Sequence, residues 1–244
     1  MAVIAVYSVK GGVGKTTLAA NLAWHSALVS CRRTLLWDLD AAGGAAFLLG
    51  EAPASARNAG RLFGKDARAQ DLLCKTRYAR LHLLPADESL RELDSLFVRI
   101  GKKKRLARLA EAFANNYERI ILDCPPVLNE ISAQVVRAAA VVVVPLPPSP
   151  LSARALDLVE EEIRRHANGG VTILPVLSML DRRRALHREA RSSHPDWPAI
   201  PFSSAVEQCA VRQEPIGAFA PTSPAARGFG QIWAAIERRL TPKS

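Results

Sequence analysis

The stretch "SVKGGVGKTT", Ser8–Thr17, follows directly on the apolar run "AVIAVY", Ala2–Tyr7. A short apolar run of this kind predicts a buried β-strand. Glycines placed after such a strand let backbone N–H groups close around phosphate oxygens, and the first turn of a following helix adds its dipole. We therefore expect a strand, a phosphate-binding loop and a helix, in that order.

The residues of this loop have different expected roles. The backbone cradle is expected to come from Gly11, Gly12, Val13 and Gly14. The motif assigns Lys15 to the β- and γ-phosphates, the Thr16 hydroxyl to Mg²⁺ and Thr17 to the α-phosphate. Where the strict motif has a glycine this chain has Val9, and a second lysine, Lys10, stands in front of the glycines. The loop is a compact variant of the phosphate-binding motif, and ATP with Mg²⁺ is its expected ligand.

Two further stretches end in carboxylates. "LLWDLD", Leu35–Asp40, reads as a strand in which Asp38 and Asp40 face the same side, because they are two residues apart. "RIILDCPP", Arg119–Pro126, is an apolar strand that ends in Asp123. Open α/β sheets bind ligands at the carboxyl ends of their strands. We expect Asp123 to hold Mg²⁺ through a bound water molecule.

The composition narrows the class of protein. The chain has 244 residues, 49% hydrophobic residues and a formal net charge of +10. This charge favours polyanionic partners such as nucleic acid or anionic lipid, although an Arg-rich composition without a binding role explains it too. The four cysteines are not at CxxC or metal-ligand spacing, which fits a reduced cytoplasmic protein. We expect neither a signal peptide nor a transmembrane helix.

Apolar segments alternate with helical patterns along residues 1–244, which predicts one α/β domain with a mostly parallel, twisted sheet and helices on both faces. The expected strands are Ala2–Tyr7, Thr34–Leu39, Leu81–Pro85, Arg119–Asp123, Ala140–Val144, Val171–Leu177 and Ala199–Pro201. The expected helices are Lys15–Ser30, Leu90–Asn115 with a break near Ile100–Gly101, Ile131–Arg137, Leu151–His166, Arg182–Arg191 and Pro224–Leu240. We expect the Ala- and Gly-rich segment Gly43–Arg68 to be a loop.

On these motifs the sequence resembles the ParA/MinD family of P-loop ATPases, whose hallmark is a phosphate loop with an additional leading lysine. The resemblance runs from Val3 to Leu240. It implies a SIMIBI-type P-loop NTPase fold and a homodimer that encloses ATP, in which Lys10 reaches the phosphates of the other subunit. It also implies that Asp40 orients the attacking water and that Asp38 belongs to the Mg²⁺ shell. The family usually follows this pair with Pro-Gln-Gly, whereas Ala41, Ala42 and Gly43 follow it here, so any role of the glutamine is open.

The resemblance also indicates where the nucleotide base would bind. The family recognises the base after the penultimate strand and at an Ile-Pro segment, which correspond here to "VLSMLDRRR", Val176–Arg184, and "AIPFSS", Ala199–Ser204. Met179, Asp181 and Pro201 are the candidate base contacts. The alternative is that both segments are ordinary loops at strand ends.

The sequence leaves the cargo of such an ATPase open, and three alternatives remain. The first is a ParA-type protein of partition or positioning, which binds DNA without sequence preference as the ATP dimer, needs an activating partner of the ParB type and associates with the nucleoid. The second is a membrane-cycling ATPase of the MinD type. The third is an accessory ATPase of a cell-envelope machine, such as those of cellulose synthesis. A scaffold without hydrolysis is disfavoured because Asp40 and Asp123 are both present.

Two features separate these alternatives. Candidate DNA contacts form a basic run at Arg182, Arg183, Arg184, Arg188 and Arg191, which could bind phosphates or could be a solvated face. A second basic run is Lys102–Arg105 with Arg108. The apolar residues of Pro224–Leu240 recur at helical spacing, and we expect them to pack on the domain rather than on a membrane.

Overall fold

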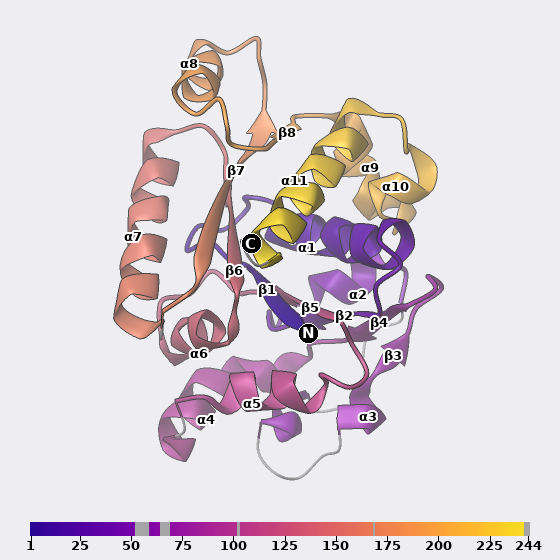
Figure 1. Ribbon diagram of the computed structural model, residues 1–244, viewed down its shortest axis with the longest axis vertical. Coiled ribbons are helices and arrows are strands. Elements are labelled where there is room, and N and C mark those ends of the chain that lie inside the picture. Colours follow the sequence, from indigo (N-terminus) through magenta and orange to yellow (C-terminus); the bar gives the residue numbers. More distant parts are fainter. Residues whose placement is uncertain (52–58, 64–68, 102, 168, 242–244) are drawn as a thin grey trace.

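The computed structural model describes residues 1–51, 59–63, 69–101, 103–167 and 169–241. Within these ranges eight strands form one sheet in the order β3-β4-β2-β5-β1-β6-β7-β8 (Figure 1). Every neighbouring pair is parallel except β3 with β4. The strands are β1 Ala2–Val6, β2 Thr34–Asp38, β3 Cys74–Lys75, β4 Leu81–Leu84, β5 Arg119–Asp123, β6 Val141–Leu146, β7 Thr172–Leu180 and β8 Ala199–Pro201. The predicted α/β class is confirmed.

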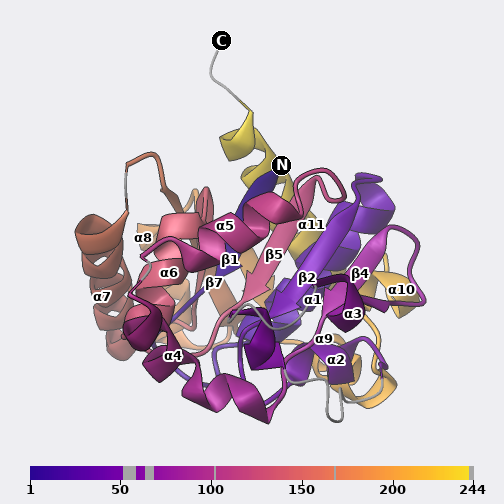
Figure 2. The same ribbon diagram turned by 90° about the horizontal axis from the view of Figure 1, so that it is seen from below.

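Helices cover both faces of the sheet (Figures 1 and 2). The α-helices are α1 Lys15–Trp24, α2 Gly44–Leu48, α3 Ala69–Leu72, α4 Leu93–Ile100, α5 Arg105–Ala112, α6 Glu130–Ala138, α7 Pro150–His166, α8 Ala185–Ser193, α9 Ser204–Arg212, α10 Ile216–Phe219 and α11 Pro224–Leu240. A π-helical segment, His25–Val29, continues α1, and 3₁₀ segments lie at Ala59–Leu62 and Glu88–Glu92.

The alternation of side chains along the strands builds two cores, one on each face of the sheet. In β1 and the residue after it, Val3, Ala5 and Tyr7 join the core under α4, α5, α6 and α7. Ile4 and Val6 point the other way, into the core under α1 and α11. Because β1 is buried on both faces, the phosphate loop starts from the centre of the molecule.

Local sequence signals account for the ends of several helices. Asn129 begins α6 with a capping box shared with Ser132. The side chain of Ser149 accepts a hydrogen bond from the Ser152 amide, and Pro150 occupies the first turn of α7. Gly101 ends α4 in the left-handed region at φ 63°, which explains the break predicted near Ile100–Gly101.

The structure differs from the expected elements in four places. The segment expected to be a loop contains α2 and the 3₁₀ turn Ala59–Leu62, whereas residues 52–58 and 64–68 lie outside the described residues. Strand β7 continues to Leu180, so Met179 belongs to the strand and not to a loop. Helix α8 begins at Ala185, so the arginines at 182–184 precede the helix. Helices α9 and α10 were also not expected, because each is short, with nine and four residues.

Helix α11 packs on the domain, as predicted. The side chains of Phe229, Ile232, Trp233 and Ile236 are 0–4% exposed and belong to the core over α1. A Cβ at Gly228 would lie 2.7 Å from the Ala199 carbonyl oxygen, so only glycine lets α11 approach β8 this closely. In the part of the chain that the structure describes, we find no helix long and apolar enough to span a membrane.

Candidate nucleotide-binding site

The phosphate loop has the backbone that its glycines predict. Gly12 and Gly14 lie in the left-handed region, at φ 71° and 88°, and Gly14 is the N-cap residue of α1. A Cβ built at Gly11 or Gly12 would meet no atom within 4 Å. The loop therefore leaves open space in front of the first turn of α1, where a phosphate chain fits.

The two lysines of the loop have different surroundings. The Lys15 side chain is buried, and its Nζ donates to the Lys10 carbonyl oxygen at 3.2 Å. Burial lowers the pKa of Lys15, and the nearby carboxylates of Asp123 and Asp40 oppose this shift. Lys10 is half-buried, and no hydrogen bond or ion pair among the described residues involves its ammonium group.

Asp38 and Asp123 are the last residues of β2 and β5, and they are direct partners in the register of these neighbouring strands. Both are almost completely buried. The two carboxylate oxygens of Asp38 accept the amides of Asp40 and Ala45, each at 3.0 Å. Burial nevertheless raises the pKa of Asp38 to about 7.

Asp123 is in a less favourable position than Asp38. Neither of its buried oxygens has a hydrogen-bond partner of good geometry among the described residues, although the Thr16 hydroxyl lies beside them. Burial raises the pKa of Asp123 well above its ordinary value, and the neighbouring Asp38 raises it further; the Thr16 hydroxyl offsets this only in part. An orphaned buried carboxylate beside a second carboxylate and a hydroxyl suits a divalent cation.

The predicted magnesium residues Thr16, Asp38 and Asp123 are thus brought together. Among the described residues no group of three His, Cys, Asp or Glu side chains surrounds one point. Mg²⁺ in nucleotide sites is held by one or two carboxylates, with phosphate oxygens and water as its other ligands. The pair of carboxylates therefore fits Mg²⁺ bound together with a nucleotide.

Asp40 lies two residues beyond the end of β2, in the turn that leads to α2. Its Oδ1 accepts the Ala42 amide at 3.1 Å, and its carbonyl oxygen accepts the Gly43 amide at 2.9 Å. The side chain is only partly buried, in contrast to Asp38. Asp40 can therefore meet water at the mouth of the site.

Helix α2 is a part of the site that sequence reasoning missed. Its Ala45 amide binds Asp38, and a Cβ at Gly44 would lie 3.0 Å from Cγ2 of Thr16. The glycine pair Gly43–Gly44 was the available signal, because Gly43 is the N-cap in the left-handed region and Gly44 lets α2 approach α1.

Of the three candidate base contacts, Met179 and Pro201 lie near the phosphate loop or next to a residue that does, whereas Asp181 is bound to Arg183. The register of β7 and β8 shifts between Leu177 and Leu180, and Met179 in this irregularity has φ 53°. Its Cε lies 3.8 Å from a Cβ built at Gly14, so Met179 reaches the phosphate loop. Pro201 of β8 pairs with Leu180, the residue that follows Met179 in β7. A non-glycine residue in the left-handed region is a frequent mark of a functional site.

Asp181 is engaged by its own chain. Its carboxylate binds Nε and Nη2 of Arg183, both at 2.9 Å, and also the Arg183 amide. These hydrogen bonds lower the pKa of Asp181 to about 2. A base contact from Asp181 would have to replace this ion pair.

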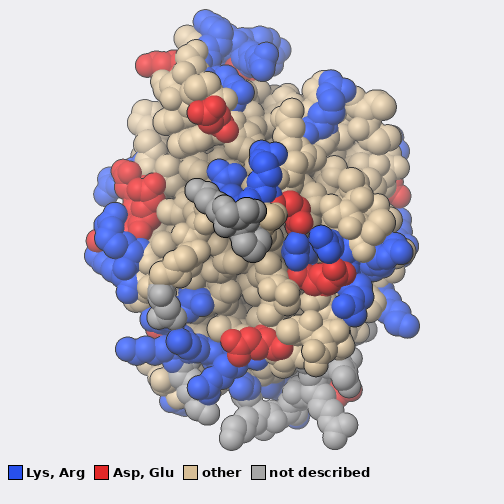
Figure 3. All heavy atoms as spheres, viewed as in Figure 1, with Lys and Arg blue, Asp and Glu red and all other residues tan. Residues whose placement is uncertain are grey.

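The five candidate DNA contacts lie on and before α8, where Figure 3 shows a concentration of blue side chains at one end of the molecule. Arg182 and Arg184 are exposed. Arg188 donates to the carbonyl oxygens of Arg182 and Arg183, and Arg191 donates to that of Trp197. In the second basic run, Arg105 binds the carbonyls of Leu62 and Phe63, and Lys102 lies outside the described residues.

Comparisons with known proteins agree with this geometry. A family model described as an AAA domain matches residues 1–170. The chain is 33% identical over 190 residues to the sporulation initiation inhibitor protein Soj of Bacillus subtilis, with 75% of each chain covered. It is 34% identical over 197 residues to the chromosome partitioning protein ParA of Caulobacter vibrioides, with 77% of this chain and 73% of the relative covered.

A solved structure supports the same assignment of the fold. The structure of cobyrinic acid a,c-diamide synthase from Mycobacterium smegmatis with bound ADP and magnesium superposes with a TM-score of 0.82. The two proteins are 25% identical, and the superposition covers 98% of this chain and 95% of the synthase.

Proposed function

This chain belongs to the ParA/MinD family of P-loop ATPases, and on that premise we propose that it is a ParA-type switch of DNA partition or cargo positioning. ATP with Mg²⁺ joins two copies into a homodimer, the dimer binds DNA without sequence preference, and hydrolysis releases it. The observation that carries the proposal is the orphaned Asp123 carboxylate beside Asp38, directly under an open phosphate loop that has a second lysine. The partition proteins Soj and ParA are among its relatives.

Bound magnesium ATP supplies the transferable phosphoryl group and the divalent charge. The chain supplies the groups around it. The amides of Gly11 to Gly14 and the ammonium of Lys15 would bind the phosphates, Thr17 would contact the α-phosphate, and Thr16, Asp38 and Asp123 would hold Mg²⁺. The role of orienting the water molecule falls to Asp40, because its carboxylate is partly exposed and accepts one amide, whereas the buried carboxylate of Asp38 accepts two.

Lys10 is the basis of the dimer. Its carbonyl oxygen receives Lys15, whereas its ammonium has no partner among the described residues. A triphosphate requires more positive charge than one lysine and Mg²⁺ provide, and a lysine from a second subunit can supply it. Dimerisation is then coupled to ATP binding.

Light scattering with Mg²⁺ and ATP tests the dimer. The wild-type protein should double its mass, whereas Lys10→Ala should bind ATP and remain monomeric. Lys104→Ala removes an exposed lysine from the beginning of α5 and should behave as wild type. A wild-type protein that stays monomeric with saturating ATP contradicts the proposal.

Hydrolysis tests the role of Asp40. Asp40→Ala should bind ATP and dimerise, with kcat reduced about 100-fold or more, because orienting the water contributes to the transition state and little to binding. Asp157→Ala on the exposed face of α7 is the matched control. Hydrolysis by Asp40→Ala at the wild-type rate would show that another group positions the water.

DNA binding is supported by the placement of charge. Three arginines at and before the N-terminus of α8 oppose the helix dipole, so they are not there to stabilise the helix. Arg182 and Arg184 are the two of these whose side chains no contact within the described chain engages, and a dimer presents them twice. Two sets of phosphate contacts steepen the salt dependence and raise the affinity.

A gel-shift titration with random-sequence duplex DNA at two salt concentrations tests this step. ATP should switch binding on, and the double variant Arg182→Glu, Arg184→Glu should lose it while it still dimerises. Arg154→Glu, Arg238→Glu makes the same charge change on α7 and α11 and should bind DNA as wild type. Association with anionic vesicles in place of DNA would instead support a membrane cycle.

A protein that cycles in this way needs a signal for hydrolysis. We assign this role to an activating partner of the ParB type and place the protein in the cytoplasm, on the nucleoid. Addition of that partner should raise the ATPase rate of the DNA-bound dimer more than that of the monomer.

A further inference from the structure

We propose that Tyr7 is a positioning residue for ATP hydrolysis, which fixes the loop after Asp123 to the strand that leads into the phosphate loop. Tyr7 directly follows β1 and is completely buried. Its hydroxyl donates to the carbonyl oxygen of Val127 at 2.6 Å, across 120 residues of sequence. This hydrogen bond joins the two loops on which the site is built.

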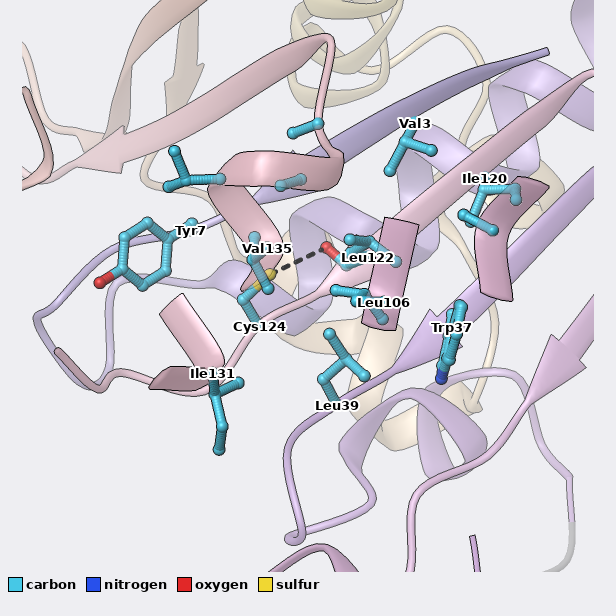
Figure 4. Close-up of a cluster of buried hydrophobic side chains, with 14 of the residues drawn as sticks. Val3, Tyr7, Trp37, Leu39, Leu106, Ile120, Leu122, Cys124, Ile131 and Val135 are labelled. Atoms are coloured by element: carbon cyan, nitrogen blue, oxygen red, sulfur yellow. Dashed lines mark hydrogen bonds between the residues drawn. The ribbon is translucent and has the colours of Figure 1, made fainter. Parts of the chain in front are cut away.

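The ring and the hydroxyl of Tyr7 lie in different environments. Figure 4 shows the ring at the edge of the apolar cluster, with the hydroxyl pointing away from Cys124 and Val135. In the same view the Cys124 thiol donates to the Leu122 carbonyl. A tyrosine hydroxyl is protonated at neutral pH, and burial raises the pKa of Tyr7 further above its ordinary value. The group is thus a permanent donor at neutral pH.

The tethered loop has few other restraints between Asp123 and α6. The Cys124 amide donates to the Val6 carbonyl at 3.3 Å, and the Val127 amide donates to the nearby Pro125 carbonyl. The next firm anchor is Ser132, whose hydroxyl accepts the Asn129 amide at 2.9 Å and lies 2.6 Å from the Glu162 carboxylate. The Tyr7 hydrogen bond falls midway between these anchors.

The effect expected of the tether is on the reaction and not on nucleotide affinity. The phosphates are bound by the loop after Tyr7, whose backbone does not depend on the hydroxyl. The backbone of Asp123 is held by β1 and β2, so the tether acts on the chain directly after it, which lies beside a carboxylate that has no well-formed hydrogen bond among the described residues. This inference rests on the proposed role of Asp123 in the metal shell.

Tyr7→Phe removes only the hydroxyl, and Tyr117→Phe is its matched control. Tyr117 is buried in the same core, and its hydroxyl lies 2.6 Å from Nδ1 of His82 near the opposite end of the sheet. We expect Tyr7→Phe to lower kcat about fivefold, the fold-change that one lost hydrogen bond typically gives, with unchanged dissociation constants for ATP and ADP. Tyr117→Phe should lose similar thermal stability and keep the wild-type kcat.

Hydrogen exchange gives a second measurement that needs no activity. The Asn129 and Ile131 amides should exchange faster in Tyr7→Phe than in wild type or in Tyr117→Phe. If Tyr7→Phe does not fold, Ser132→Ala tests the same loop through kcat, which should fall; exchange of its Asn129 amide is not informative, because that amide loses its acceptor. Wild-type kcat and exchange in Tyr7→Phe, or an equal fall in kcat in Tyr117→Phe, would overturn the proposal. If Asp123→Asn retained full Mg²⁺-dependent activity, the metal role of Asp123 would fail, while the exchange result would still test the tether.

Discussion

Charged side chains are paired at the amino ends of the strands, whereas the buried carboxylates at the carboxyl ends have no ion-pair partner among the described residues. At the amino ends of the strands, Arg119 binds Glu237 of α11 through two hydrogen bonds of 2.7 and 2.9 Å. Arg32 binds Glu118 at 2.9 Å. At the carboxyl ends, Asp38 and Asp123 are more deeply buried, yet no arginine or lysine within the described residues forms an ion pair with either.

The difference shows which end has a ligand to bind. Paired charges at the amino ends stabilise the fold by themselves, whereas unpaired buried carboxylates cost free energy until a cation arrives. The nucleotide-free protein therefore carries a destabilised site that binding relieves. The predictions below act on one end or the other, and they are ordered by the size of the expected effect.

The largest effect is expected at the carboxyl ends of the strands, from removal of the buried ammonium group of Lys15. Lys15→Ala should weaken ATP binding about 100-fold or more, because a charge-assisted contact to the phosphates is lost from a buried position. Isothermal titration with Mg²⁺ and ATP measures this. Lys104→Ala should bind ATP as wild type, and a less than threefold loss in Lys15→Ala would mean that Lys15 does not contact the nucleotide.

The second effect is a gain in stability when a buried acid is neutralised. Folding raises the pKa of Asp38 from 3.8 to about 7, so the folded protein binds this proton more tightly than the unfolded chain does. The penalty therefore begins above about pH 4, grows up to about pH 7 and stays constant above it. Asp38→Asn turns an amide NH2 toward one of the two backbone N–H groups that the carboxylate accepts, a cost that does not change with pH. Its effect on the free energy of unfolding of the nucleotide-free protein should therefore be more favourable at pH 8 than at pH 4.5, by roughly 2 kcal/mol.

Urea denaturation at the two pH values measures this gain. Asp157→Asn, on the exposed face of α7, is the control and should change little at either pH. Asp38→Asn should also lose Mg²⁺ affinity, so its advantage should disappear when Mg²⁺ and ATP are added. An equal gain at both pH values would assign the stabilisation to something other than the titration of Asp38.

The smallest effect is expected at the amino end. Arg119→Ala should lower the free energy of unfolding by about 1 kcal/mol, because the pair with Glu237 is bidentate but partly accessible to water. The dissociation constant for ATP should not change. Thermal unfolding and ATP titration of the same variant measure both quantities, and a loss of ATP affinity would show that the two ends of the sheet are coupled.

The residues of the candidate site could be predicted from the sequence more completely than the contacts around them. Gly12, Lys15, Asp38 and Asp123 were predictable because their motifs require fixed residue types next to apolar strands. The direct pairing of Asp38 with Asp123 was not, because strand register is a tertiary property. Likewise, no local sequence pattern predicts that the backbone of Met179 adopts the left-handed region.

Contacts across long sequence separations were also out of reach. The alternation in β1 predicts that Tyr7 is buried, but its hydrogen bond to Val127 depends on the path of a loop 120 residues away. The basic run after β7 was predictable as charge, whereas the engagement of Arg183 by Asp181 and of Arg188 by backbone carbonyls depends on the turn before α8. Composition alone does not distinguish arginines that hold a turn from those that face solvent.

The central place of β1 also decides when the protein can first acquire its site during synthesis. Strand β1 precedes both of its neighbours in the chain, and these neighbours, β5 and β6, are completed only at Asp123 and Leu146. At about 5–20 residues per second, the leading strand waits roughly 6–30 s for both of them. During that time the strand before the glycine loop has no paired neighbours. A nascent chain that ends before Leu146 therefore cannot retain nucleotide.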